Sequence, residues 1–140
     1  LSAMLESYED DLRAFDVDVL KVGHHGSKNA TSADFLRAVT PKMAIIQAGD
    51  SAEDNATYSA YSFAHPNKIA VDLLRGPDGV SMSRPRKEVR VGVKGRARNP
   101  DAPPVFTNIR LDKAVYSNGW DGDIAVTARA DGSLSIETEY

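Results

Sequence analysis

The stretch that decides the fold is residues 16–49, DVDVLKVGHHGSKNATSADFLRAVTPKMAIIQAG. Its first seven residues form a short run rich in valine, which is typical of a buried strand. Ser32 is a candidate helix N-cap, and apolar residues at helical spacing follow it until Pro41 forbids continuation. A second apolar run at 43–47 predicts another strand. This order of strand, helix and strand predicts an α/β fold with a right-handed parallel crossover.

The flanking segments supply further predicted elements. Apolar residues at positions 1, 5, 8 and 12 predict an amphipathic N-terminal helix. Pro66 is expected in the first turn of a later helix. That helix is predicted to present Ile69, Ala70, Leu73 and Leu74 to the core. Strands are expected at 114–116, 123–128 and 133–138, the last two joined by an Asp131-Gly132 turn.

A basic run interrupts this pattern. Residues 84–98 contain seven Lys or Arg against the single Glu88, so the run carries +6 and the remainder of the chain carries −9. Prolines follow at positions 100, 103 and 104. We therefore predict a surface insertion over 84–107, with a hairpin at 88–93 and a short strand just before it at 79–83.

Composition excludes several classes of protein. The chain has 140 residues, 41% hydrophobic and 26% charged, which fits one soluble globular domain. It contains no cysteine, so disulfide scaffolds, thiolate nucleophiles and Cys-ligated zinc are excluded. No segment approaches the roughly 18 consecutive apolar residues of a membrane span, and no secretory signal opens the chain. A cytoplasmic location is expected, although the absence of cysteine does not fix the compartment.

All three histidines lie at the boundaries of predicted elements. His24 and His25 follow the first strand, and His65 follows the long polar segment 50–64. Imidazole binds zinc and exchanges protons near neutral pH, and ligands of α/β folds usually lie at strand ends. Were the strand to continue through His24 and His25, only one of them would easily reach a shared site. Surface or capping histidines are an equally weighted alternative.

The local sequence favours one family. Residues 18–28, DVLKVGHHGSK, resemble the His-His-Gly-Ser segment of metallo-β-lactamase-fold hydrolases, and most closely the ComEC-like competence-protein branch. The similarity continues through the predicted helix and second strand to the pair His65-Pro66, and returns weakly at 119–138. It implies an α/β fold in which residues 1–140 form the C-terminal half of an αββα metallo-β-lactamase sandwich, with a basic surface insertion at about 84–107.

The resemblance also implies roles for individual residues. His65 would be the late metal-ligating histidine, and His24 or His25 would hydrogen-bond a phosphoryl oxygen or protonate the leaving group. Ser27 would donate to an oxyanion or cap the loop, with capping favoured. Lys28 would attract an anionic substrate, against the default of a solvated lysine. Acidic residues of the long loop could add ligands, or simply be hydrated: Asp50, Glu53 and Asp54.

One departure from the family bears on the metal. The family's His-x-His-x-Asp-His cluster is not present in residues 1–140, whereas a catalytic zinc usually has about three protein ligands. The chain also begins at Leu1, without Met and inside an apolar-periodic segment. We interpret it as a fragment that lacks the N-terminal half of its domain, with two divalent metals, zinc or manganese, in the intact protein and none or an incomplete set here.

The function implied is therefore metal-dependent hydrolysis of phosphodiesters, including those of nucleic acid, by the intact protein, with the fragment itself inactive. As an alternative, the basic segment 84–98 could make the chain a non-catalytic interaction or nucleic-acid-binding module. No aromatic residue is interleaved in that segment, so stacking on single strands has no support from the sequence. Half of a sandwich would expose apolar surface, which predicts a homodimer.

Overall fold

The computed structural model describes residue 3 and residues 6–7, 11–49, 59–95 and 102–140. Short helices alternate with strands up to residue 75, strands predominate from residue 83 onward, and the fold is α/β as predicted. In this part of the chain the strands form three groups: one parallel sheet and two antiparallel hairpins. Within the described residues, no helix combines the length and the apolarity that a membrane crossing requires.

The parallel sheet is the centre of the fold. It contains β1 (Val19–Val22), β2 (Met43–Ile46) and β5 (Val115–Ser117) in the order β1-β2-β5. Both pairings are parallel, with Val19 opposite Met43 and Ala44 opposite Val115. The predicted parallel pairing of the first two strands is confirmed, although the first begins three residues later than its valine run suggested.

Helix α2 (Ala33–Val39) connects β1 to β2 and has the predicted boundaries. The Ser32 hydroxyl accepts a hydrogen bond from the Phe35 backbone N–H at 3.2 Å, which satisfies one of the free donors of the first turn. Thr40 adopts the left-handed conformation with φ of 38°, and Pro41 follows it. The helix buries Leu36, Ala38 and Val39.

Helix α3 (Lys68–Arg75) differs from its prediction in two respects. Its N-cap is Asn67, whose side chain accepts from the Ile69 N–H, so Pro66 precedes the helix rather than lying in its first turn. The buried residues are Ala70, Val71 and Leu74, whereas Ile69 is 56% exposed. At about 100° per residue, an inward face centred between positions 70 and 71 turns position 69 outward. The prediction that Ile69 faces the core is therefore wrong.

The predicted N-terminal helix is described only in part. Residues 1, 5 and 8 of the predicted amphipathic helix lie outside the described residues. The part that follows is a short 3₁₀ helix, η1 (Leu12–Phe15).

A long antiparallel hairpin replaces the predicted surface insertion. Strand β3 (Ser83–Lys94) pairs with β4 (Val105–Lys113), and their side chains Val89, Val91 and Leu111 are buried in the core. The sequence predicted a hairpin only at 88–93 and placed 84–107 outside the regular elements. That prediction is wrong for 84–94, which lie in β3, and for 105–107, which lie in β4. The valines alternate with charged residues, so one face of β3 is apolar although the segment as a whole is strongly basic.

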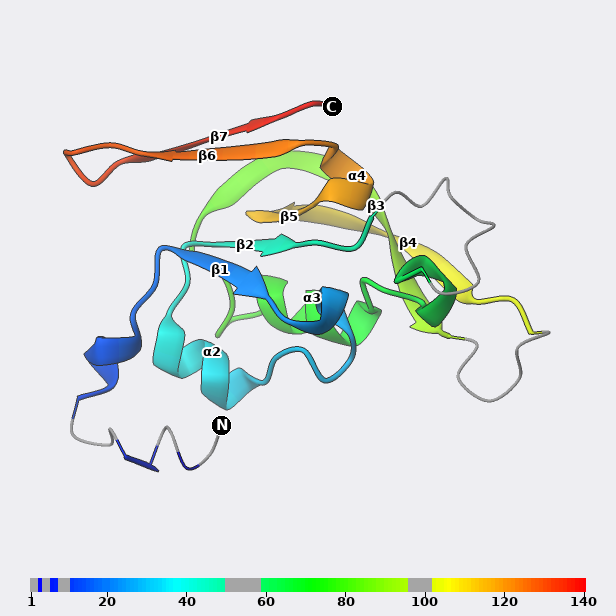
Figure 1. Cartoon of the computed structure of the whole chain (residues 1–140), viewed down its shortest axis with the longest axis horizontal. Coiled ribbons are helices and arrows are strands. Elements are labelled where there is room, and N and C mark those ends of the chain that lie inside the picture. The colour runs from blue at the N-terminus through cyan, green and yellow to red at the C-terminus, as the bar shows by residue number, and fades with distance from the viewer. Residues whose placement is uncertain (1–2, 4–5, 8–10, 50–58, 96–101) are drawn as a thin grey trace.

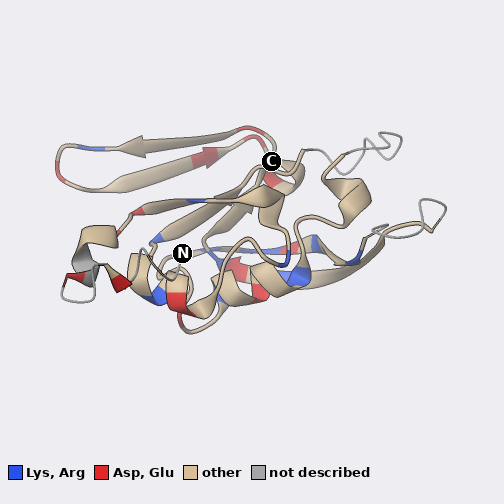
Figure 2. Ribbon diagram, turned by 60° about the horizontal axis from the view of Figure 1, so that its bottom comes forward, with Lys and Arg blue, Asp and Glu red and all other residues tan. Residues whose placement is uncertain are grey.

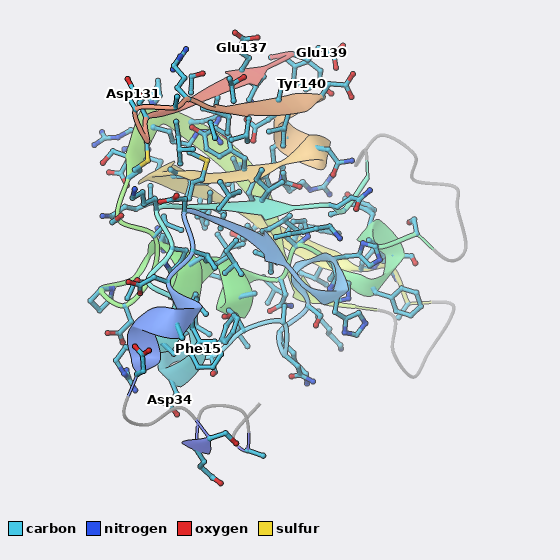
Figure 3. The ribbon with its side chains drawn as sticks, turned by 60° about the vertical axis from the view of Figure 1, so that its left-hand side comes forward. Phe15, Asp34, Asp131, Glu137, Glu139 and Tyr140 are labelled. Atoms are coloured by element: carbon cyan, nitrogen blue, oxygen red, sulfur yellow. The ribbon has the colours of Figure 1, made fainter. Side chains whose placement is uncertain are left out.

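The C-terminal elements match their predictions closely. Strand β6 (Ile124–Ala128) pairs antiparallel with β7 (Leu134–Thr138), and the short helix α4 (Asn118–Asp121) precedes them. Asp131 lies at the turn, where its carboxylate accepts from the Ser133 N–H, and Gly132 has φ of +80° (Figure 3). This hairpin and α2 lie on opposite sides of the parallel sheet in Figure 1.

Candidate functional site

The histidine pair lies in a tight turn directly after β1. The 3₁₀ segment η2 (His24–Gly26) starts two residues after the strand ends, and both histidines have positive φ, 46° for His24 and 53° for His25. Both side chains are exposed. Because the chain turns here instead of continuing as a strand, the two rings are not constrained to opposite faces of a sheet.

The structure brings His65 next to His24. His65 follows the 3₁₀ helix η3 (Tyr61–Phe63) and precedes Pro66 across a cis peptide bond. The ring centroids of His24 and His65 are 5.7 Å apart, with the ring planes at 65° to each other. Of the three histidines predicted to line one site, residues 24 and 65 therefore lie together as an edge-to-face pair of imidazoles.

Backbone contacts hold the two histidine loops together. The Asn67 N–H donates to the Gly26 carbonyl at 2.7 Å. Gly26 has φ of +71°, and a Cβ at this position would lie 3.0 Å from Ile46 Cγ2 and 3.2 Å from Pro66 Cβ. Glycine is required here both by the left-handed backbone and by the close approach of the second loop.

His25 has a different partner. Its Nδ1 lies 2.5 Å from the carbonyl oxygen of Gln47, the residue that follows β2. Since a carbonyl only accepts, Nδ1 carries the proton in this contact. The sequence could not separate the two histidines, whereas in the structure His24 faces His65 and His25 anchors its loop to the end of the neighbouring strand.

Ser27 and Lys28 occupy different environments. Ser27 is buried, and its hydroxyl lies 3.1 Å from Nδ1 of His24. This contact orients the His24 ring, with its direction set by the ring tautomer. Lys28 is exposed beside the turn. Their predicted roles in substrate binding remain predictions.

The environment of His65 favours a neutral ring. Burial is the largest effect and lowers the pKa of His65. A hydrogen bond with the Ala64 backbone opposes it in part, and the charges that His24 and His25 carry when protonated lower the pKa further. Nδ1 of His65 is buried and makes no hydrogen bond of standard geometry within the described residues. A neutral imidazole with a free nitrogen is a proton acceptor and is also the form that binds metals.

The described residues do not by themselves fit a metal centre. Within them, no three His, Asp or Glu side chains gather as a metal ion would require. The acidic candidates Asp50, Glu53 and Asp54 lie outside the described residues. Because zinc takes about three or more protein ligands, the His24 and His65 pair alone leaves such a site incomplete.

The basic segment is partly committed to the fold. Arg84 Nη2 and Lys87 Nζ lie 2.6 Å and 2.9 Å from the same carboxylate oxygen of Asp121. The Arg84 side chain is 6% exposed and that of Asp121 is 0% exposed, so this pair is buried. These two cations are therefore not available to grip phosphates as the sequence suggested.

The remaining cations of the run are more accessible. Arg86, Arg90 and Lys94 are exposed, whereas Arg96 and Arg98 lie outside the described residues. Figure 2 shows Lys and Arg spread over several elements and interspersed with acidic residues. Fewer cations of β3 are therefore accessible to a ligand than the charge count of the sequence implied.

Sequence reasoning missed one residue that shapes the site. The Asn118 side-chain oxygen accepts from the backbone N–H groups of Ala48 and Gly49, at 2.8 Å and 3.2 Å. These two hydrogen bonds fix the backbone directly after Gln47, whose carbonyl oxygen contacts His25. Nothing in the local sequence indicates this contact, because it joins segments far apart in the chain.

A separate pocket lies beside β1. Its volume is about 320 Å³, and it is lined mainly by the strand and by the segment before α2, including Leu20, Val22, Asn29, Thr31 and Phe35. None of the three histidines lines it. The histidine pair therefore lies outside this cavity.

Two curated proteins match part of the chain. ComE operon protein 3 of Bacillus subtilis (strain 168) is 41% identical over 58 residues, which is 41% of this chain and 6% of that protein. Recombination protein 2 of Haemophilus influenzae is 58% identical over 77 residues, which is 53% of this chain and 10% of that protein. The chain thus matches only a small part of the length of both relatives. No protein-family profile matches the chain. No solved structure matches it.

Proposed function

We propose that the chain is part of a phosphodiester hydrolase of the metallo-β-lactamase type that acts on nucleic acid. Three observations support this proposal. Residues 18–28 resemble the His-His-Gly-Ser segment of that superfamily. The names of the two relatives refer to the ComE operon and to recombination, which associates the chain with competence. The histidines picked out by the resemblance include two whose rings pair in space.

The pairing of His24 and His65 carries the proposal. The two residues come from separate loops, yet their ring centroids lie 5.7 Å apart at the end of the parallel sheet. Ligands of α/β folds bind at this edge, outside the carboxyl ends of the strands. Two histidines that served only to cap separate loops would have no physical need for such an arrangement.

The two rings suit different parts of phosphodiester hydrolysis. In this reaction the oxygen of water bonds to phosphorus, the bond from phosphorus to the leaving sugar oxygen breaks, and the leaving oxygen takes up a proton. His24 is exposed and oriented by Ser27, so it is placed to hydrogen-bond a phosphoryl oxygen or to protonate the leaving oxygen.

His65 supplies a neutral ring nitrogen instead. Its lowered pKa keeps it unprotonated at neutral pH, which is the form that would act as one ligand of a divalent metal. The superfamily resemblance implies two such metals, zinc or manganese, and the remaining ligands would come from residues beyond those described. A bound metal would polarise the phosphoryl group.

The proposal is tested by hydrolysis of a single-stranded oligonucleotide and of bis(p-nitrophenyl) phosphate by the natural polypeptide that carries these residues, with zinc or manganese added. His24→Ala and His65→Ala should each reduce the rate by about 10²- to 10⁴-fold. Lys42→Ala, an exposed residue paired with Asp18, should leave it unchanged. Absence of hydrolysis in the unaltered polypeptide, or full activity in His65→Ala, would contradict the proposal.

The alternative function is a non-catalytic nucleic-acid-binding module. The exposure of Arg86, Arg90 and Lys94 on β3 favours it. Binding by these cations alone would neutralise phosphates without reading sequence, and affinity would fall steeply with salt. Loss of oligonucleotide binding in an Arg86→Gln and Lys94→Gln double variant, in a protein without hydrolytic activity, would favour this function over the first.

A further inference from the structure

A cluster of aromatic rings lies against the exposed part of the basic strand. The rings of Tyr61 and Phe106 stack with centroids 4.2 Å apart and planes 12° from parallel. The Arg90 guanidinium lies 4.7 Å from the Phe106 centroid and 5.3 Å from the Tyr61 centroid. The sequence offered no aromatic partner for the basic run, but folding brings rings from η3 and β4 onto β3.

Phe63, two residues after Tyr61 in η3, lies next to a histidine of the candidate site. Its ring is 44% exposed, and its centroid lies 6.5 Å from that of His65, with the planes 27° apart. A solvent-exposed phenylalanine beside a candidate site is unusual, because burying such a ring stabilises a fold. The surface of this ring is available to another planar group.

The end of β3 lies against the backbone of η3 at Phe63. A Cβ at Gly95 would lie 2.5 Å from the Phe63 carbonyl oxygen, so the backbone of β3 just after Lys94 touches η3. Lys94 is exposed, and its partner in β4 is Val105, which is 48% exposed. Val93, 53% exposed, precedes it. Figure 1 shows η3 beside this end of the β3–β4 hairpin.

We propose that this surface, formed by Phe63, Arg90 and Lys94, binds single-stranded nucleic acid next to the His24 and His65 pair. An unpaired base stacks on Phe63, and the cations of β3 hold the neighbouring phosphates. The inference rests on the proposed function, for which it names the substrate form and a binding residue. A duplex is a poor occupant, because its bases already stack on one another and present no free faces to an exposed ring.

The exposed cations and the exposed apolar side chains together favour single-stranded nucleic acid as the ligand of this surface. Exposed valines and a ring alone would suit many partners, and exposed cations alone would suit any polyanion. Single-stranded nucleic acid combines planar apolar faces with regularly spaced phosphates, which matches the exposed Phe63 ring on η3 beside a strand that carries the exposed cations Arg90 and Lys94. A protein partner would need neither the free ring face nor the neighbouring cations in this combination.

The test is fluorescence anisotropy of a labelled ten-nucleotide oligothymidylate with the 140-residue chain, in EDTA so that no metal-dependent chemistry contributes. Phe63→Ala should weaken binding about five- to a hundredfold, and Phe63→Trp should retain it. Ile69→Ala is the matched control, because Ile69 is another exposed apolar side chain, on α3. Circular dichroism of each variant establishes that it is folded.

Salt dependence separates stacking from charge. Lys94→Gln should lower the slope of log Kd against log salt by about 0.7, as the loss of one phosphate contact requires, whereas Phe63→Ala should leave the slope unchanged. Lys42→Gln, at another exposed lysine, is the control.

Each outcome decides the inference independently of hydrolysis. Preference for the single strand over a ten-base-pair duplex, with a specific loss in Phe63→Ala, supports it. Equal binding by Phe63→Ala and the unaltered chain, equal affinity for duplex, or no binding in EDTA overturns it. In those cases the hydrolysis experiment on His24 and His65 still decides the proposed function, since it is read from rate and not from affinity.

Discussion

The backbone N–H of Asn67 donates a 2.7 Å hydrogen bond to the carbonyl of Gly26, and this bond joins the loop of His24 to the loop of His65. Asn67 is also the N-cap of α3, because its side chain accepts from the Ile69 N–H at 3.0 Å. The start of a helix and the two histidine turns therefore form one connected unit. The position of the His65 ring depends on backbone contacts outside either histidine.

Gly26→Ala tests this connection. A Cβ here would crowd Ile46 and Pro66, in addition to the strain of φ at +71°, so we expect a loss of about 1–3 kcal/mol in the free energy of unfolding, measured by urea denaturation. Gly132→Ala is the matched control, because Gly132 has φ of +80° but nothing lies within 4 Å of its Cβ position. If both variants lose the same stability, the contact between the loops contributes nothing.

A second prediction concerns the titration of His65. Its pKa should lie below the ordinary 6.5, because burial and the nearby His24 and His25 disfavour the protonated ring. His24→Gln should raise this pKa, since one of those charges is removed. The measurement is a pH titration of the imidazole resonances by NMR, and a His65 pKa at or above 6.5 would contradict the burial argument.

The same shift has a consequence for stability. Below pH 6.5 the unfolded chain binds a proton at His65 that the folded chain resists, so the free energy of unfolding should fall as the pH drops from 6.5 through the lowered folded pKa. His65→Gln should remove this part of the pH dependence. A denaturation series between pH 5 and 7.5 measures it, and an unchanged slope in the variant would count against the shift.

The Asp121 cluster gives a third prediction. Burial alone would raise the pKa of this carboxyl, but hydrogen bonds from Arg84, Lys87 and the Ser117 N–H lower it below 3.8. Asp121→Asn leaves Arg84 buried beside a neutral group and should cost about 3–5 kcal/mol. Asp112→Asn, at an exposed position on β4, should cost little.

The pKa of Asp121 is lowered by hydrogen bonds to its charged form, whereas that of His65 is lowered by burial. In both cases the free energy of unfolding falls as the pH falls. Because the folded pKa of Asp121 is lowered, its contribution is present above pH 3.8 and is lost as the pH falls through the folded value. Asp121→Asn should therefore flatten the acid limb of the stability curve below pH 3.8. An acid limb equal to that of the unaltered chain would show that the carboxylate pairs are not needed for stability.

Local patterns predicted the first half of the fold well. The valine run before Gly23, the Ser32 cap and the apolar run at 43–47 each act within a few residues, so β1, α2 and β2 follow from sequence alone. The proximity of His24 and His65 was also expected, from the placement of both at loop boundaries and from the family resemblance.

Contacts between distant segments of the chain could not be predicted from such local patterns. The charges of residues 84–94 obscured the alternating valines of β3, so a core strand was mistaken for an insertion. Asp121 neutralises Arg84 and Lys87 from a distant helix, and Phe106 and Tyr61 reach Arg90 from two other elements. None of these partners has a signal in the sequence near the residue that it contacts.

The orientation of α3 yields the final prediction. Leu74 is completely buried, whereas Ile69 is 56% exposed, although the apolar pattern of the sequence assigned both to the core. Leu74→Ala should lower the free energy of unfolding by about 2–5 kcal/mol, because it leaves a cavity, and Ile69→Ala should change it by less than about 0.5 kcal/mol. Urea denaturation of the two variants measures the difference. Equal losses would mean that Ile69 is covered in solution, and α3 would then bury a wider face than Ala70, Val71 and Leu74 provide.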